Sequence, residues 1–188
     1  GRSHGGDYNT RFAELGQITK GNVSQLKPAW SYRSGDTPGN VQCNPIVVDG
    51  VMYVTGPRNT AAALDARTGR AIWQYVRRLP NDIHANCTVM TNRGVAILGN
   101  TLYMATLDSH LVALDAKTGN PLWDVAVDDY KTGTSITHAP LAIDGKIIVG
   151  ITAGECALQI IAQHRRRSSD ALISMPLAIL DRDQLNDQ

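Results

Sequence analysis

Several features that identify other classes of protein are scarce or absent in this sequence. It has one phenylalanine and three cysteines, and the cysteine spacing matches neither a zinc site nor a Cys-x-x-Cys redox pair. The net charge of +1 offers no electrostatic support for binding nucleic acid or an anionic membrane. No apolar run approaches the roughly 18 residues of a membrane span. There is also no Gly-x-Gly-x-x-Gly and no Walker loop, so nucleotide-dependent chemistry has no support.

What the sequence does contain is a segment that occurs twice, fifty residues apart. Residues 63–69 (Ala-Leu-Asp-Ala-Arg-Thr-Gly) lead to Trp73, and residues 113–119 (Ala-Leu-Asp-Ala-Lys-Thr-Gly) lead to Trp123. The apolar stretches upstream of each copy repeat at the same offset. A fixed period of this length is typical of repeat architectures, in which each unit buries its apolar face against its neighbours.

Each repeat has the pattern of four short strands joined by turns rich in Gly, Asn and Asp. The aspartate of the motif can accept hydrogen bonds from the turn ahead, and its glycine supplies a positive φ. The tryptophan then offers a large flat surface for packing against the adjoining unit. We therefore predict an all-β fold, a β-propeller of four-stranded antiparallel blades, with adjacent blades over residues 41–76 and 94–126.

A third repeat begins at residues 139–149 but does not continue with the motif. Residues 160–175, where the motif is due, are unrelated to it. We predict two regions: 1–158, holding about three blades of an incomplete ring, and 159–188, a tail that lacks the blade pattern and packs poorly. A reading-frame shift or a chimeric gene end explains such a change. A basic anchor around residues 165–167 is the functional alternative, and residues 172–188 have the pattern of a short amphipathic helix.

Three loops interrupt the repeats with polar residues: 42–45, 92–96, and 137–140 followed by 150–155. Propellers carry function in such loops, near the central axis. Taken singly, each loop is equally well explained as a capped turn.

Together, the repeats and these loops closely resemble the pyrroloquinoline quinone (PQQ) dehydrogenases, the quinoprotein alcohol and sugar dehydrogenases. The resemblance covers residues 5–158: the opening segment 5–18, the two tryptophan motifs, and the elements Asn-Arg-Gly (92–94), Thr-His-Ala-Pro (137–140) and Gly-Glu (154–155), in the family's order. It implies an eight-bladed propeller, of which this chain holds about three blades.

The resemblance also implies site residues. PQQ carries three carboxylates and an ortho-quinone, so its site needs cations, hydroxyls and amide donors. Arg93 would lie at the quinone oxygens, where a guanidinium stabilises the charge formed on reduction. Glu155 would ligate calcium, a hard cation that prefers oxygen and acts as a Lewis acid on the quinone. The remaining cofactor-binding positions would be Gln42, Thr137, Thr152, Ala153 and Gly154. The alternative for Arg93 and Glu155 is a solvated turn charge.

The chain departs from the family pattern at three points. Cys87 stands alone where many members have two adjacent cysteines, so their disulfide is impossible here. A bridge between Cys43 and Cys87 is one replacement, although three separate thiols (Cys43, Cys87 and Cys156) fit better. Gln42 replaces a glutamate found in several members. The family's catalytic aspartate falls further downstream, so we expect no catalytic residue in this chain.

The resemblance favours the N-terminal portion of a PQQ- and calcium-dependent dehydrogenase of primary alcohols or sugars. Such an enzyme works in the periplasm and passes electrons to cytochrome c or a membrane quinone, although no signal peptide is visible here. We expect the isolated chain to be inactive. The alternative from another class is a cofactor-free propeller scaffold, which needs the tryptophan motifs but not Arg93, Thr137 and Glu155 together.

Overall fold

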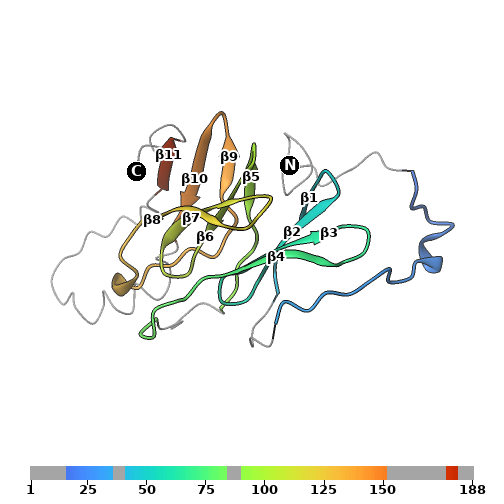
Figure 1. Ribbon diagram of the computed structural model, residues 1–188, viewed down its shortest axis with the longest axis horizontal. Helices are drawn as coiled ribbons and strands as arrows, with labels where there is room; N and C mark the ends of the chain where they lie inside the picture. Colours follow the sequence, from blue (N-terminus) through green and yellow to red (C-terminus); the bar gives the residue numbers. More distant parts are fainter. Residues whose placement is uncertain (1–15, 36–40, 84–89, 152–176, 182–188) are drawn as a thin grey trace, which may run out of the picture.

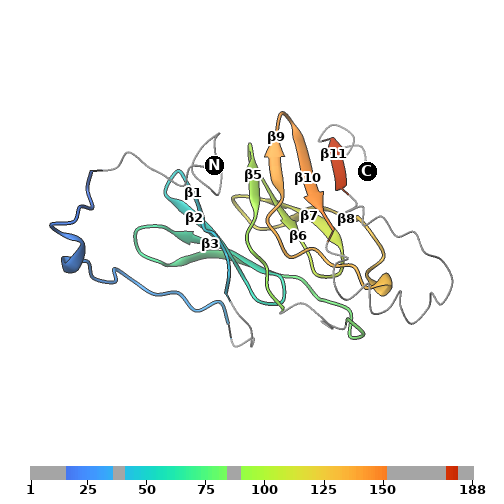
Figure 2. The ribbon, with the colours of Figure 1, turned by 180° about the vertical axis from the view of Figure 1, so that it is seen from behind.

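The computed structural model describes residues 16–35, 41–83, 90–151 and 177–181. Within these ranges the regular structure is β-sheet, apart from the short 3-10 helices η1 (Val23–Gln25) and η2 (Tyr130–Thr132) (Figure 1). No helix in these ranges is long and apolar enough to span a membrane. The strands form three antiparallel sheets that follow one another along the chain, as a view from behind also shows (Figure 2).

Two of the sheets have the same four-stranded plan. Blade one has the order β1 (Ile46–Val48), β2 (Val51–Gly56), β3 (Thr60–Asp65) and β4 (Ala71–Val76). Blade two has the order β5 (Ala96–Leu98), β6 (Thr101–Ala105), β7 (His110–Asp115) and β8 (Pro121–Ala126). The register shifts at the corresponding point of each blade, after Ala63 and after Ala113. The prediction of two adjacent four-stranded blades is confirmed.

The repeated motif forms the turn between the third and fourth strands. In blade one, Asp65 Oδ1 accepts hydrogen bonds from the backbone N–H and the hydroxyl of Thr68, both at 2.8 Å. In blade two, Asp115 Oδ1 accepts the same two bonds from Thr118, at 2.8 and 3.0 Å. The aspartate and threonine therefore satisfy the turn locally, as their spacing predicts.

Trp73 joins blade one to blade two. Its indole Nε1–H donates to Ala116 O at 3.0 Å, and its ring covers Gly119. A Cβ on Gly119 would lie 2.5 Å from the ring, and the glycine has φ of +74°. Glycine is therefore required both by the backbone and by the closeness of the indole.

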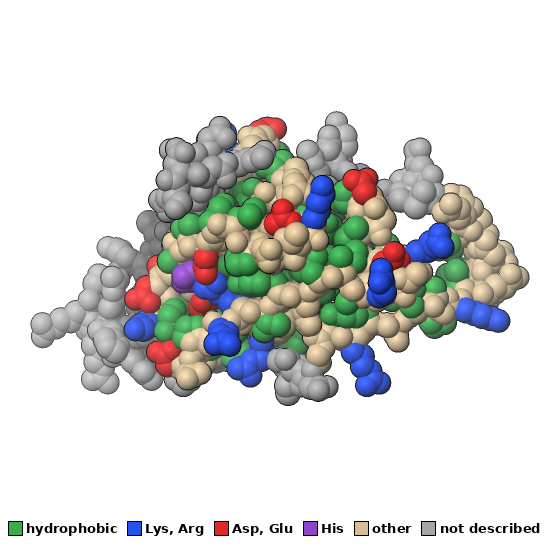
Figure 3. Space-filling model, viewed as in Figure 1, with side chains coloured by type: hydrophobic (Ala, Val, Ile, Leu, Met, Phe, Trp, Pro, Cys, Tyr) green, Lys and Arg blue, Asp and Glu red, His purple; other side chains and the backbone are tan. Residues whose placement is uncertain are grey.

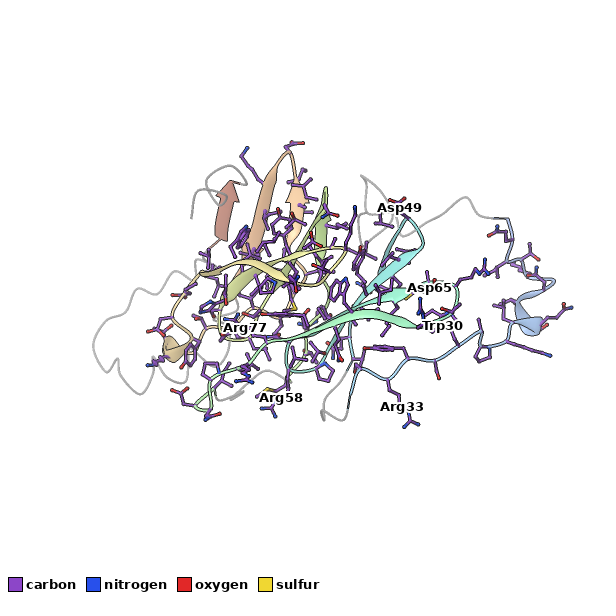
Figure 4. The ribbon with its side chains drawn as sticks, in the orientation of Figure 1. Trp30, Arg33, Asp49, Arg58, Asp65 and Arg77 are labelled. Atoms are coloured by element: carbon purple, nitrogen blue, oxygen red, sulfur yellow. The ribbon has the colours of Figure 1, made fainter. Side chains whose placement is uncertain are left out.

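Trp30 makes the same contact one blade earlier. It donates to Ala66 O at 3.2 Å and covers Gly69. Figure 4 shows Trp30, from the N-terminal segment, beside Asp65 at the turn of blade one. Trp30, from residues 16–35, therefore packs on blade one in the same way as Trp73, from β4, packs on blade two.

The core lies between successive sheets and consists of two clusters. The first joins blades one and two around the fully buried Leu102, Met104, Val112 and Leu114. The second joins blades two and three around Leu111, Ile136, Ile147 and Val149. On the face drawn in Figure 3, hydrophobic side chains gather over the sheets, and charged side chains of both signs are scattered among and around them.

A charged cluster also bridges blades one and two. The buried guanidinium of Arg77, at the end of β4, donates to Asp108 at 2.7–2.9 Å and to Asp124 at 2.6 Å (Figure 4). His110 Nδ1 lies 2.7 Å from the other oxygen of Asp124. Burial alone would raise the pKa of Asp108, but the hydrogen bonds from Arg77 and Thr106 outweigh it and lower that pKa.

Blade three differs from the sequence prediction. It has the order β11 (Leu177–Asp181), β10 (Lys146–Gly150) and β9 (Leu141–Ile143). Asp181 is paired with Lys146, the first residue of β10, just as Asp65 is paired with the first residue of β2 and Asp115 with that of β6.

The expectation that residues 172–188 form a helix is therefore wrong for 177–181, which form a strand, although the segment still lacks the Thr-Gly and Trp of the repeat motif. The physical reason is that β10 presents unpaired backbone groups along one edge, and an apolar segment pairs with them. The rest of the tail lies outside the described residues, and the boundary near residue 158 stays a prediction.

Candidate functional site

Three connecting loops meet where the first strand of each blade begins. Asn44, before β1, donates its backbone N–H to Arg93 O at 3.2 Å. Arg93, before β5, donates its own backbone N–H to Thr137 O, before β9, at 2.9 Å. β5 and β9 lie side by side in both ribbon views (Figures 1 and 2). The loops of three successive blades are thus linked through their backbones.

The side chains of Arg93 and Thr137 also contact each other. Arg93 Nη1 donates to Thr137 Oγ1 at 2.6 Å. Thr137 is buried whereas Arg93 is exposed. Among the residues that the structure describes, Thr137 is the one hydrogen-bond partner of this guanidinium. The loop therefore presents a cation that is held at one nitrogen and has further N–H donors for an oxygen-rich ligand.

Gly94 is required at the bend that follows Arg93. Its φ is +131°, and a Cβ there would lie 3.3 Å from the backbone oxygen of Asn44. With any side chain here, the backbone of Asn44, which donates to Arg93, would have to shift by a few tenths of an ångström. The positive φ and the close approach of Asn44 therefore explain why a glycine follows Arg93 in the Asn-Arg-Gly sequence.

His138 lies next to Thr137 and is held in its neutral form. Its Nε2 accepts the backbone N–H of Gly150, the last residue of β10, at 3.0 Å. Burial, and after it the positive charge of Arg93, lower the pKa of His138. At neutral pH the proton is therefore on Nδ1, and Arg93 supplies the positive charge of this loop pair.

The structure places some of the predicted site residues and leaves others outside the described ranges. Gln42 is exposed in the loop before β1, two residues from Asn44. Arg93 and Thr137 are in direct contact. The other predicted residues lie outside the described ranges: Thr152, Ala153, Gly154 and Glu155. The described residues contain no cluster of three or more His, Cys, Asp or Glu side chains placed to hold a metal ion. The roles of all seven residues stay predictions.

Cys43 is a free thiol, so the bridge to Cys87 is not formed. Its Sγ accepts the backbone N–H of Thr55 at 3.1 Å, which ties the loop before β1 to β2. Cys87 itself lies outside the described residues.

Sequence reasoning missed the supporting residues of this region: Asn44, Asn92 and His138. Each lies next to a predicted residue or within a quoted motif, which is the available signal. Their hydrogen-bond partners lie on other strands and loops, so the sequence does not reveal them.

The comparisons with known proteins place this geometry in a family. The family model described as "Glucose/ethanol/alcohol dehydrogenase, beta-propeller domain" matches residues 2–159. The quinoprotein alcohol dehydrogenase PedH of Pseudomonas putida is 43% identical over 151 residues, which cover 80% of this chain and 25% of that protein. The 1-butanol dehydrogenase (cytochrome c) of Thauera butanivorans is 43% identical over 153 residues, covering 79% and 22%.

Solved structures agree. The quinohemoprotein alcohol dehydrogenase ADHIIG of Pseudomonas putida HK5 has a TM-score of 0.70 at 44% identity, covering 76% of this chain and 21% of that one. A europium-containing methanol dehydrogenase has a TM-score of 0.71 at 38% identity, covering 78% and 26%. The chain thus spans about a quarter of the length of these relatives. From the matched residues, the tryptophan motifs and the blade topology, this chain belongs to the β-propeller family of the PQQ-type glucose, ethanol and alcohol dehydrogenases.

Proposed function

We propose that this chain supplies part of the cofactor site of a PQQ- and calcium-dependent alcohol dehydrogenase. The observation that carries the proposal is the Arg93–Thr137 pair, which presents a fixed, exposed guanidinium where three blades meet. The donor set fits the cofactor, because PQQ is rich in carboxylate and carbonyl oxygens and a guanidinium binds such oxygens through several N–H groups.

Each residue of the pair has a distinct task in this proposal. When bound, PQQ supplies the quinone carbonyl that accepts hydride from the alcohol. Arg93 binds the quinone oxygens and stabilises negative charge there. Thr137 holds the guanidinium through its hydroxyl. His138 stays neutral, so that Arg93 remains the cation of the loop pair.

The other predicted residues complete the proposed site: Gln42 in the described loop before β1, and four residues outside the described ranges. Thr152, Ala153 and Gly154 bind the cofactor, Gln42 adds an amide, and Glu155 ligates the metal. Oxygen ligands suit calcium. A europium-containing relative makes a trivalent cation of the same hard class a second metal to test.

The names of the relatives support a proposal for the substrate and the electron acceptor. They are alcohol dehydrogenases, and one acts on 1-butanol with cytochrome c while another 1-butanol dehydrogenase is named for a quinone acceptor. We therefore propose a primary alcohol as substrate, cytochrome c or a membrane quinone as acceptor, and the periplasm as the site of action. Sugar oxidation is the less favoured substrate class.

The test is a titration of the 188-residue chain with PQQ, followed by its absorbance and by tryptophan fluorescence, with calcium or europium(III) present. Arg93→Gln should weaken PQQ binding about tenfold to a hundredfold, because it removes charge-assisted hydrogen bonds. Arg33→Gln, at an exposed arginine of the N-terminal segment (Figure 4), is the matched control and should bind as the wild type does. An equal dissociation constant for Arg93→Gln would contradict the proposal.

The scaffold alternative makes the opposite prediction, because it expects no PQQ binding by the wild type. If the chain binds PQQ, we expect no alcohol oxidation when calcium and an electron acceptor are added, because the family's catalytic base has no counterpart in this sequence. Turnover by the chain alone would overturn that part of the proposal. Glu155→Gln should reduce the metal dependence of PQQ binding.

A further inference from the structure

Asn92, directly before Arg93, is buried, and both its side chain and its backbone oxygen are hydrogen-bonded. Its side-chain oxygen accepts the backbone N–H of Gly94 at 3.0 Å, and its Nδ2 donates to Ala105 O at 2.7 Å. Its backbone oxygen accepts the hydroxyl of Thr55 at 3.1 Å. These bonds attach one residue to the end of β6 and to β2, hence to both blades.

The bond from Gly94 to the Asn92 side chain closes a turn around Arg93. An asparagine that accepts the N–H two residues ahead forms an Asx turn, which sets the backbone direction of the residue between them. That residue here is Arg93. The turn and the Thr137 hydroxyl therefore act on Arg93 from its two ends, one through the backbone and one through the guanidinium.

Asn59 supports Asn92 from blade one. It is completely buried, and its Oδ1 lies 3.4 Å from Asn92 Nδ2. Its backbone has φ of +59°, and its own Nδ2 has no hydrogen-bond partner among the residues that the structure describes. A buried, unpaired amide in a left-handed turn is costly. Its acceptor faces Asn92, which fixes the orientation of the Asn92 amide.

We propose that Asn92 is a positioning residue for Arg93. Its hydrogen-bond partners among the described residues are Thr55, Asn59, Ala105 and Gly94 rather than the guanidinium, and it acts by holding the turn that aims Arg93 at Thr137. The effect of this positioning on PQQ binding rests on the proposed function. The positioning of the Arg93 side chain is itself a property of the chain without cofactor.

The first measurement follows Arg93 directly, without PQQ. In the ¹⁵N-labelled chain, the guanidinium signals of Arg93 are identified by their loss in Arg93→Lys, and their hydrogen exchange is measured. Thr137→Val removes the acceptor and gives the reference for a released guanidinium. We expect Asn92→Ala to speed this exchange about tenfold, towards the Thr137→Val value. Asn92→Asp keeps the acceptor for Gly94 but loses the donor to Ala105, and should give an intermediate rate.

The matched control is Asn100→Ala. Asn100 also donates through Nδ2, at 2.8 Å to Asp115, but lies at an exposed turn between β5 and β6. It should leave Arg93 exchange unchanged. Backbone amide exchange in β7 reports whether the blade as a whole is loosened. An Asn92→Ala exchange rate equal to that of wild type, or an equal loss of protection at Arg93 and in β7, would overturn the positioning role.

If Asn92→Ala fails to fold, Asn92→Asp and Asn59→Gly test the positioning role instead. Asn59→Gly allows the left-handed backbone and removes the supporting amide. Unchanged Arg93 exchange in both folded variants would equally overturn the role. The second measurement is PQQ affinity, which should fall in Asn92→Asp and not in Asn100→Ala. Failure of wild type to bind PQQ would refute the proposed function but not the exchange result, so the two failures are distinguishable.

Discussion

At the scale of single residues, the roles of several glycines and aspartates follow from the atoms that surround them. Gly119 lies under an indole that a side chain would displace, whereas Gly94 is required mainly by its positive φ and lies close to a neighbouring loop. Asp65 and Asp115 satisfy their own turns, whereas Asp108 is buried against Arg77 of the previous blade. The same residue type therefore serves a local turn in one place and an interblade contact in another.

Gly119→Ala tests the packing of the indole. We expect it to cost about 1–2 kcal/mol for the left-handed backbone and a further 1–3 kcal/mol for the clash with Trp73. Gly99→Ala is the control, because Gly99 also has positive φ but has open space around it. Urea unfolding of both variants measures the difference. Equal losses would show that Trp73 does not restrict this position.

The Asp108 carboxyl gives a pH dependence of stability. Its pKa is lowered in the folded chain, so its contribution is fully present above the unfolded value of about 3.9 and is lost as the pH falls through the lower folded pKa. Asp108→Asn should destabilise the chain at neutral pH by leaving Arg77 with a buried, partly unpaired charge. This difference from wild type should shrink below about pH 4.

Unfolding by urea at several pH values measures this effect. Asp144→Asn, at an exposed turn between β9 and β10, is the control and should change stability by less than about 0.5 kcal/mol. A difference between wild type and Asp108→Asn that stays constant with pH would contradict the prediction.

At the scale of elements, the third strand of blade three comes from a segment without the repeat motif. β11 takes the register of β3 and β7, with an aspartate at the corresponding position, although the segment lacks the Thr-Gly and Trp of the motif. The edge of β10 requires a partner for its backbone groups, and an apolar segment supplies one without matching the motif.

Ile179→Pro tests this pairing. Ile179 is paired with Ile148 at the centre of β11, and proline removes a backbone donor and distorts the ladder. We expect faster amide exchange in β10 and no change in β6 and β7. Ile173→Pro, four residues before the strand, is the control. Unchanged protection of β10 in Ile179→Pro would show that β11 does not stabilise blade three.

At the scale of the whole molecule, successive blades are held by tryptophan contacts and by a core shared between sheets. Trp30 is seated on blade one and Trp73 on blade two in the same way. Among the described residues, Trp123 makes no such contact with a turn of the next blade, although it packs against Tyr103 with ring centroids 5.7 Å apart. Blade one is therefore joined to blade two by the Trp73 indole and by a shared core, and blade two to blade three by a second core cluster.

Trp73→Ala should cost about 3–5 kcal/mol, because it removes the interblade contact of a large ring. Trp73→Phe keeps a ring and loses the N–H bond to Ala116, so we expect a smaller cost of about 1–2 kcal/mol. Trp123→Phe is the matched control at the same position of blade two and should cost less than Trp73→Phe. Denaturant unfolding measures all three. A loss below about 1 kcal/mol for Trp73→Ala would mean that this indole does not join the blades.

The blades of this protein follow from its sequence because their bonds are local. Asp65 with Thr68, and Asp115 with Thr118, close turns within four residues, and the alternating strands around them have one way to bury their apolar side. The family resemblance also pointed to Arg93 and Thr137 as members of one site, without showing how they meet.

Only the tertiary structure decided which residues contact each other across the blades. Arg93 and Thr137 are 44 residues apart, Trp30 donates to a carbonyl 36 residues away, and Asn92 is held from two strands. β11 also became a strand because β10 had an open edge, not because of a motif. These contacts depend on where separate blades lie relative to one another, and that placement is set by the packing of whole sheets rather than by any local pattern.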